Sequence, residues 1–340
     1  MRGVFTYSNP RLIHWGAGSV AQLGAELQRL EASRSAVVTT RSLLESVDRL
    51  GLAPAATVVI AQHAPMSQIN AGVEEVKAAG AEAIVSFGGG SVIDAAKIIS
   101  VRLAGDDGRA LPHIAVPTTL SVAELAAGAG YTNEGGDKAG MRDPRLMVEA
   151  VTYDAQLTLA TPMKLWLSTG IRALDHAIEG FLADGEHPFS DVMSLDAIRR
   201  LFDSLPRAKA HPDDLNVRTE NQIAAWFSFT LPGASASGLS HTMGKQIGAR
   251  HGIPHGVTSC LLLPDVMRYL EPKMPERMLL LAQATGLDPA ARVEELIATL
   301  GLPQHIAAYD VGQAELRRAA QELAGKYPEP DLLGIYLAAL

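Results

Sequence analysis

Apolar positions follow two alternating patterns over the first 150 or so residues. Short runs rich in β-branched and other apolar residues lie at 35–40, 56–61, 82–87 and 113–119. Amphipathic helical patterns precede and separate them, at 19–31, 42–50, 66–80 and 91–105. Short strands separated by helices of this length predict a parallel sheet with crossover helices. In such sheets ligands bind at the carboxyl ends of the strands.

Beyond about residue 154 the strand patterns fade and helical patterns follow one another. They span 161–183, 188–205, 215–229, 238–252 and 257–272, with further segments to the last residue. Proline is restricted to helix starts or breaks, so we expect such points at Pro162, Pro206 and Pro264. The chain is therefore predicted to form an α/β domain over 1–154 and an all-helical domain over 155–340.

Composition excludes several classes of protein. The 340 residues are 47% hydrophobic and 19% charged, which is typical of a globular protein with ample core material. The net charge is −8 and no run of Lys or Arg forms a basic stripe, which argues against nucleic acid as a partner. The single cysteine, Cys260, excludes an internal disulfide framework and fits a cytoplasmic location. Residues 1–16 lack an apolar signal core and no stretch is a membrane-span candidate, so no membrane association is expected.

The segment SFGGGSVIDAAK, residues 86–97, predicts an anion site. A strand ends at Phe87, Gly88, Gly89 and Gly90 make the turn, and Ser91 stands at the start of a helix. Free N–H groups and the helix dipole favour an anion such as a pyrophosphate there. Ser91 could cap the helix and donate to a phosphate oxygen. An ordinary strand-to-helix turn is the alternative. Asp94 and Lys97 make the motif more specific than a lone glycine pair.

A second hydroxyl-rich segment, VPTTLSVAE, follows the fourth strand. Thr118, Thr119 and Ser121 would lie at the carboxyl end of that strand, where a ligand binds. A helix cap with spare threonines is the alternative for this segment.

The helical half contains four histidines and two cations that point to chemistry. In GIRALDHAIE, Arg172 and His176 are four residues apart and share a helix face. His241 and Lys245 repeat that spacing within residues 238–256, which also contain His251 and His255. His176, His241 and His255 could converge, and neutral imidazoles bind transition metals. For any one of these histidines, a purely structural role is the alternative.

These motifs, in this order, resemble the iron-containing (group III) alcohol dehydrogenase superfamily. The residues that carry the resemblance are GGGSVIDAAK, PTT, DHAIE and GLSH…GIPHG. The superfamily includes maleylacetate reductases and is related to glycerol dehydrogenases and dehydroquinate synthases. The resemblance implies a Rossmann-like dinucleotide-binding domain followed by an all-α catalytic domain, in a homodimer. It also implies a pyrophosphate site at Gly88–Ser91, a cofactor-lining role for Thr118 and Thr119, and an approach of Lys138 to the nicotinamide ribose.

The sequence departs from the family pattern at the metal site. Metal-dependent members bind Fe²⁺ or Zn²⁺ with one Asp and three His, and the matching positions here are Arg172, His176, His241 and His255. Arginine stays protonated and has no lone pair for a metal. Its charge beside a dication would cost several kcal/mol at an effective dielectric constant of about 20. The maleylacetate reductase branch also lacks the aspartate and is regarded as metal-independent, so the resemblance favours that branch.

Without a metal, fixed cations would have to stabilise the developing alkoxide. We expect His241 and His176 nearest the carbonyl, one as general acid, with Lys245 and His255 assisting. Arg172 would clamp a substrate carboxylate, or instead form an ion pair with Asp175 or Glu179. Arg250 and His251 would add positive potential, so an oxo acid is the expected substrate.

Three alternatives stay open. A metal-dependent dehydrogenase could complete its site with water or Asp175. A cyclase or lyase similar to dehydroquinate synthase, or a non-catalytic nucleotide-binding relative, would oxidise no NAD(P)H.

The choice of cofactor is partly readable from the second strand. NAD-preferring relatives often place an aspartate after it to bind the ribose hydroxyls. Here Thr40 stands there and Arg41 follows. Arg41 could bind a 2′-phosphate, so the cofactor is predicted to be NAD or NADP.

Overall fold

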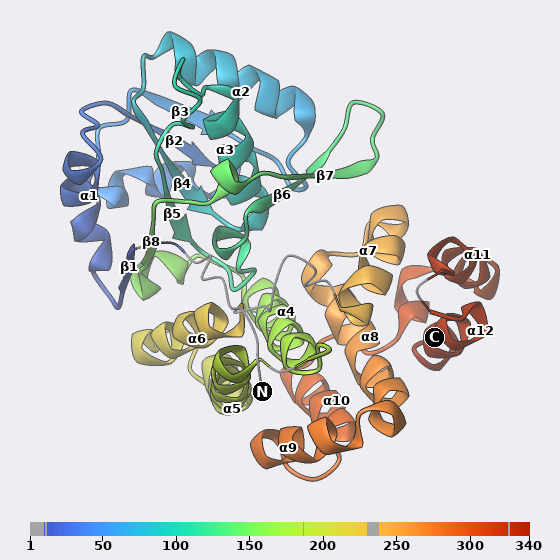
Figure 1. Ribbon diagram of the computed structural model, residues 1–340. Coiled ribbons are helices and arrows are strands. Elements are labelled where there is room, and N and C mark those ends of the chain that lie inside the picture. The colour runs from blue at the N-terminus through green and yellow to red at the C-terminus, as the bar shows by residue number, and fades with distance from the viewer. Residues whose placement is uncertain (1–9, 11, 186, 230–237, 326) are drawn as a thin grey trace. The chain divides into compact units, whose positions relative to one another are not determined.

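The computed structural model describes residues 10, 12–185, 187–229, 238–325 and 327–340 (Figure 1). The described chain divides into two compact units. The α/β unit runs to Pro162 and also includes Asp213–Gln222, and the helical unit comprises Met163–Pro212 and Ile223–Leu340.

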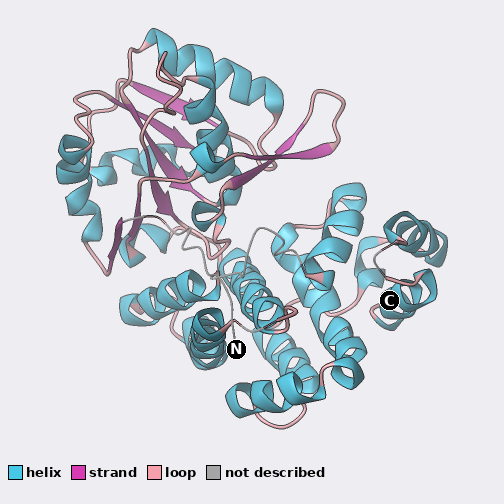
Figure 2. Cartoon of the chain, viewed as in Figure 1, coloured by secondary structure: helices cyan, strands magenta, loops and turns pink. Residues whose placement is uncertain are grey.

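A six-stranded parallel sheet forms the centre of the α/β unit (Figure 2). Its strand order is β1-β8-β5-β4-β2-β3. The bounds are β1 Leu12–Trp15, β2 Ser35–Thr39, β3 Ala56–Val59, β4 Ala83–Gly88, β5 His113–Pro117 and β8 Ala150–Tyr153. The four strands expected from the sequence are confirmed as β2 to β5. The pattern did not predict β1 and β8, each four residues long, or the antiparallel hairpin of β6 Gly128–Thr132 and β7 Lys138–Arg142.

Helices cover both faces of this sheet. They are α1 Leu23–Arg29, a 3₁₀ helix over Arg41–Leu50, α2 Met66–Ala78 and α3 Gly90–Arg102. Strand β2 shows why these strands have continuous apolar sequences. Ala36 and Val38 pack in the core with α2 and α3, whereas Val37 packs in the core with α1 and the 3₁₀ helix. A strand buried on both faces has no polar alternation.

The helical unit holds the longest helices of the described chain. Its α-helices are α4 Met163–Phe181, α5 Pro188–Ala210, α6 Leu215–Ser228, α7 Leu239–His251, α8 His255–Leu270, α9 Pro275–Thr285, α10 Pro289–Leu300, α11 Gln313–Leu323 and α12 Glu329–Ala338. The first part of α6, up to Gln222, is assigned to the α/β unit. None of the helices in the described ranges is long and apolar enough to cross a membrane.

Two of the three expected proline breaks are wrong. Pro162 directly precedes α4, as predicted, but Pro206 lies inside α5 and Pro264 inside α8. A proline inside a helix removes one hydrogen bond and crowds the preceding turn. The buried face of α8, which includes Leu261, Leu262 and Val266, packs into the helical core and outweighs that cost.

Candidate active site

The glycine turn between β4 and α3 lies directly beneath the hydroxyl segment. A Cβ at Gly89 would come within 3.0 Å of Thr119 Cγ2, and one at Gly90 within 3.1 Å of Ser121 Oγ. Thr118 is tied to the same turn, because its N–H donates to the Gly88 carbonyl at 2.9 Å. The structure thus brings the two predicted cofactor segments together at the carboxyl ends of β4 and β5. Backbone N–H groups at the start of α3 can receive an anion there.

Ser91 does not cap α3. The N-cap is Gly89, no side chain caps the helix, and Ser91 lies in the first turn. Its hydroxyl oxygen accepts the backbone N–H of His63 at 2.9 Å. Asp94 likewise faces the hairpin, since its carboxylate accepts the Gly130 N–H at 2.9 Å.

The other predicted cofactor residues surround this edge of the sheet. Thr40 immediately precedes the 3₁₀ helix that starts with Arg41, and Arg41 is exposed. Lys138 begins β7, and its charge adds to burial in lowering the pKa of His63.

Lys97 has a role that the sequence alone did not reveal. It is fully buried, and its ammonium donates to the carbonyls of Ala123, Ala126 (2.6 Å) and Gly128 (3.0 Å). All three N–H donors are satisfied, so Lys97 anchors the loop that follows the hydroxyl segment. Nearby, burial raises the pKa of Glu124 to about 6, although Tyr153 donates a hydrogen bond to it at 2.7 Å. The available signal was a lysine flanked by the apolar residues Ala95, Ala96, Ile98 and Ile99.

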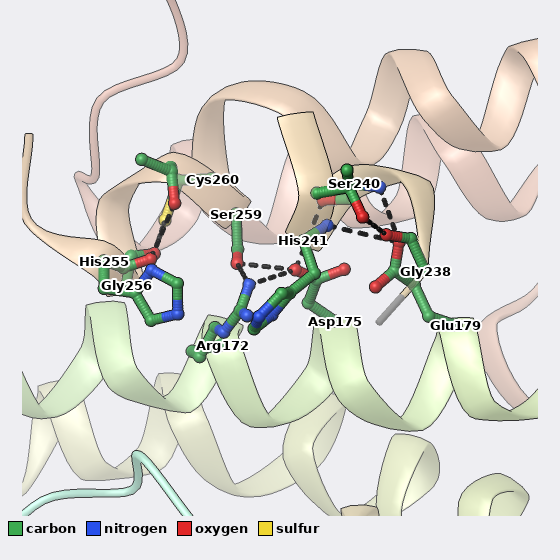
Figure 3. Close-up of polar contacts among 12 residues, drawn as sticks. Arg172, Asp175, Glu179, Gly238, Ser240, His241, His255, Gly256, Ser259 and Cys260 are labelled. Carbon is green, nitrogen blue, oxygen red and sulfur yellow. Dashed lines mark hydrogen bonds and ion pairs between the residues drawn. The ribbon is translucent and has the colours of Figure 1, made fainter. Parts of the chain in front are cut away.

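Three helices of the other unit build a second polar cluster (Figure 3). Arg172, Asp175, His176 and Glu179 come from α4, Ser240, His241 and Lys245 from α7, and His255 and Ser259 from α8. Two glycines let the helices approach. A Cβ at Gly256 would lie 2.7 Å from the Ser168 carbonyl of α4, and one at Gly244 would lie 2.8 Å from Thr258 Oγ1 of α8.

The three imidazoles form a continuous group. Ring centroids of His176 and His241 are 5.6 Å apart, and those of His241 and His255 are 5.1 Å apart. Burial, followed by the charges of Arg172 and Lys245, lowers the pKa of His176 well below its ordinary value. His176 is therefore a neutral imidazole at neutral pH.

Arg172 is an internal cation. Its side chain is 2% exposed, and Nη1 donates to Asp175 Oδ2 at 2.9 Å and to Ser259 Oγ at 2.8 Å. Ser259 and Ser240 donate to the same Asp175 oxygen at 2.6 Å and 3.2 Å. Of the two roles considered from the sequence, the Arg172–Asp175 ion pair is present.

One edge of that guanidinium is unused. Nε and Nη2 of Arg172 are buried and have no hydrogen-bond partner among the residues that the structure describes, and the same holds for Asp175 Oδ1 and His241 Nδ1. In arginine, Nε and Nη2 project from a single edge of the plane, which is the edge that binds a carboxylate with two parallel bonds.

The donor set fits a metal ion poorly. In the described ranges no group of three or more His, Cys, Asp or Glu side chains is arranged to hold a metal. The charges of Arg172 and Lys245 both act on His176, one of the imidazoles that would have to bind the ion. These charges would also repel a dication.

Arg250 and His251 are not brought to the imidazole group. They occupy the last turn of α7, more than two turns beyond His241. Arg250 pairs with Glu322 of α11, and His251 Nε2 lies 4.0 Å from Glu315 of the same helix.

Comparison with known proteins agrees with this fold. A model of the iron-containing alcohol dehydrogenase matches residues 10–155, and one of the C-terminal part of the Fe-containing alcohol dehydrogenase family matches 166–328. The chain belongs to this family and is an NAD(P)-dependent oxidoreductase.

Within the family the chain is similar to maleylacetate reductases. It is 32% identical over 330 residues to that of Rhizobium sp. (strain MTP-10005), covering 95% of this chain and 92% of the relative. It is 31% identical to that of Pseudomonas aeruginosa, covering 97% and 94%. The crystal structure of maleylacetate reductase from Agrobacterium tumefaciens superposes with a TM-score of 0.90 at 29% identity, covering 100% of this chain and 99% of that one.

Proposed function

We propose that this protein reduces the carbonyl group of an oxo acid with NADPH or NADH, without a metal ion. The observation that carries the proposal is Arg172, a buried cation with two unpartnered donors on one edge of its guanidinium. The resemblance implies a carboxylate ligand at this position in metal-dependent members. The similarity to maleylacetate reductases supports an oxo acid as the substrate class.

In this reaction a hydride carries two electrons from the nicotinamide C4 to the carbonyl carbon, and the oxygen takes up one proton. His241 is the proposed proton donor: it would enter the step as the imidazolium, give one proton to the carbonyl oxygen and end as a neutral imidazole. Burial and neighbouring charges keep His176 neutral, so it would donate only a hydrogen bond. Arg172 binds the substrate carboxylate through Nε and Nη2. The charge of Lys245 stabilises the developing alkoxide.

The cofactor part of the proposal rests on the glycine turn. Gly88–Ser91 would hold the pyrophosphate, Thr118, Thr119 and Ser121 would line the dinucleotide, and Lys138 would approach its ribose. Exposed Arg41 after β2 could bind a 2′-phosphate, so either NADPH or NADH would serve.

The test is NADPH and NADH oxidation by metal-stripped protein. The purified protein is treated with a chelator, its metal content is measured, and absorbance at 340 nm is followed with maleylacetate and other oxo acids. We expect turnover to survive metal removal. Turnover that is lost and then restored by Fe²⁺ or Zn²⁺ would contradict metal independence, and no oxidation with any carbonyl would contradict the reductase itself.

A metal-dependent dehydrogenase is the second candidate, because three neighbouring imidazoles supply the ligand type of catalytic zinc sites, although the described side chains would have to move to bind an ion together. Arg172→Asp distinguishes the two. It restores the carboxylate of the metal-dependent relatives and should raise Zn²⁺ affinity in calorimetry while lowering turnover of oxo acids. Wild-type protein that already binds Zn²⁺ tightly would favour the second candidate.

A further inference from the structure

Helix α7, which presents His241, has no capping side chain of its own. Its N-cap is Gly238, and the first turn contains no acidic residue. The first N–H groups of a helix have no intrahelical acceptor and need another partner. Ser, Thr, Asp or Asn ordinarily supply it at the N-cap.

Here the acceptor comes from a different helix. Glu179 Oε1, on α4, accepts the backbone N–H of Ser240 at 2.6 Å and that of His241 at 3.4 Å (Figure 3). These are the second and third residues of α7, the two positions that an N-cap side chain serves. One turn earlier on α4, Asp175 accepts the Ser240 hydroxyl at 3.2 Å. Helix α4 therefore holds the first turn of α7 at two points.

Gly238 shows that this arrangement leaves no room for a side chain. Its φ of −67° and ψ of −176° are open to any residue, so the backbone does not require glycine. A Cβ there would nevertheless lie 2.5 Å from Glu179 Oε2 and would overlap the carboxyl carbon. An alanine at 238 must push the Glu179 carboxyl off the helix end.

We propose that Glu179 is a positioning residue for His241, acting as a cap supplied by α4 to the start of α7. This inference rests on the proposed function of His241 as proton donor. The cap holds the His241 backbone, and through it the spacing of its ring from those of His176 and His255. Burial and the neighbouring Asp175 raise the pKa of Glu179 well above its ordinary value, so glutamine is a close substitute for the carboxyl group.

The kinetic test compares Glu179→Ala, Glu179→Gln and Gly238→Ala. We expect kcat to fall at least about tenfold in Glu179→Ala and in Gly238→Ala with little change in the KM of NAD(P)H, and Glu179→Gln to recover most of it. In Glu179→Ala/Gly238→Ala the second change has no carboxyl to displace, so the double variant should be no slower than Glu179→Ala alone. Gly334→Ala, where no atom lies within 4 Å of the new Cβ, is the matched control.

A second readout does not depend on turnover. With histidine labelled with ¹³C at Cε1, the His241 signal is assigned from its loss in His241→Gln. It should shift in Glu179→Ala and Gly238→Ala and return towards its wild-type position in Glu179→Gln. A signal that moves in protein without reductase activity would retain the cap and reject the proposed function. The cap would be overturned by a His241 signal that does not move in the variants. It would also be overturned by equal losses of kcat in Glu179→Ala and Glu179→Gln, or by additive losses of kcat in the double variant.

Discussion

Lys97 and Arg172 are both buried cations, one in each unit, and they differ in how their donors are used. Lys97 directs three N–H groups at three loop carbonyls and has no donor to spare. Arg172 uses only Nη1, and its other two nitrogens are unpartnered within the described chain. A buried charged donor without an acceptor costs free energy. Such a donor is therefore found where a bound ligand or a water molecule supplies the missing acceptor. The difference separates a cation whose donors are all used by the fold from one with two buried donors that the fold leaves unpaired within the described chain.

The largest expected effect is on stability, at Lys97. Lys97→Met removes the one ammonium that donates to the carbonyls of Ala123, Ala126 and Gly128, and we expect the free energy of unfolding of the α/β unit to fall by about 3–5 kcal/mol. Urea denaturation followed by circular dichroism measures it. Lys77→Met, at an exposed position of α2, is the control. Equal stability of the two variants would mean that the loop does not depend on the ammonium.

The next effect is on specificity, at Arg172. In Arg172→Met we expect kcat/KM to fall about 10- to 100-fold for an oxo acid, because charge-assisted hydrogen bonds contribute about 1.5–3 kcal/mol. The methyl ester of the same acid, which lacks the carboxylate, should change far less. The ratio of the two kcat/KM values is the measurement. Equal losses for acid and ester would assign Arg172 to the ion pair with Asp175 alone.

A rise in pH should change the stability of the two units in opposite directions, through Glu124 in the α/β unit and His176 in the helical unit. The pKa of Glu124 is raised to about 6 from 4.5, so its contribution to stability is present below pH 4.5 and is lost as pH rises to about 6. Relative to Glu124→Gln, wild-type stability should therefore fall by about 2 kcal/mol between pH 4.5 and pH 7.

His176 provides the opposite sign. Its pKa is lowered, so the stability due to its neutral form is present above pH 6.5 and is lost as pH falls. Relative to His176→Gln, wild-type stability should rise with pH. Chemical denaturation of the wild type, Glu124→Gln and His176→Gln between pH 4.5 and pH 7 measures how each stability difference changes with pH. Two differences that change in the same direction would contradict the opposite effects expected of Glu124 and His176.

The smallest effect is expected for a partly exposed cation. Arg250 pairs with Glu322 and its side chain is 30% exposed. Surface ion pairs contribute about 0–1 kcal/mol, so Arg250→Ala should change stability by no more than about that amount. We also expect kcat/KM for an oxo acid to change less than about twofold, since Arg250 lies more than two helical turns from His241. A large rise in KM would restore the substrate-binding role that the sequence suggested.

Most of the fold could be predicted because periodicity is a local property. Strands β2 to β5 and the helices between them follow directly from their apolar patterns. Strands β1 and β8 have only four residues each, too few for a pattern to separate them from apolar loop segments. The proline expectation failed at Pro206 and Pro264 because packing of a long helix outweighs one lost hydrogen bond.

For the site, the sequence by itself determined which chemical groups are available and roughly where they stand on their helices. It indicated that His176, His241 and His255 could converge, and the resemblance implied a guanidinium where metal-dependent members have a carboxylate. Only the tertiary structure decided which acceptors those groups find. The contacts of Arg172 with Ser259, of Lys97 with the loop carbonyls, and of Glu179 with the start of α7 join residues 26 to 87 positions apart. Hydrogen bonds act over about 3 Å, and no local pattern in a chain reports distances of that kind.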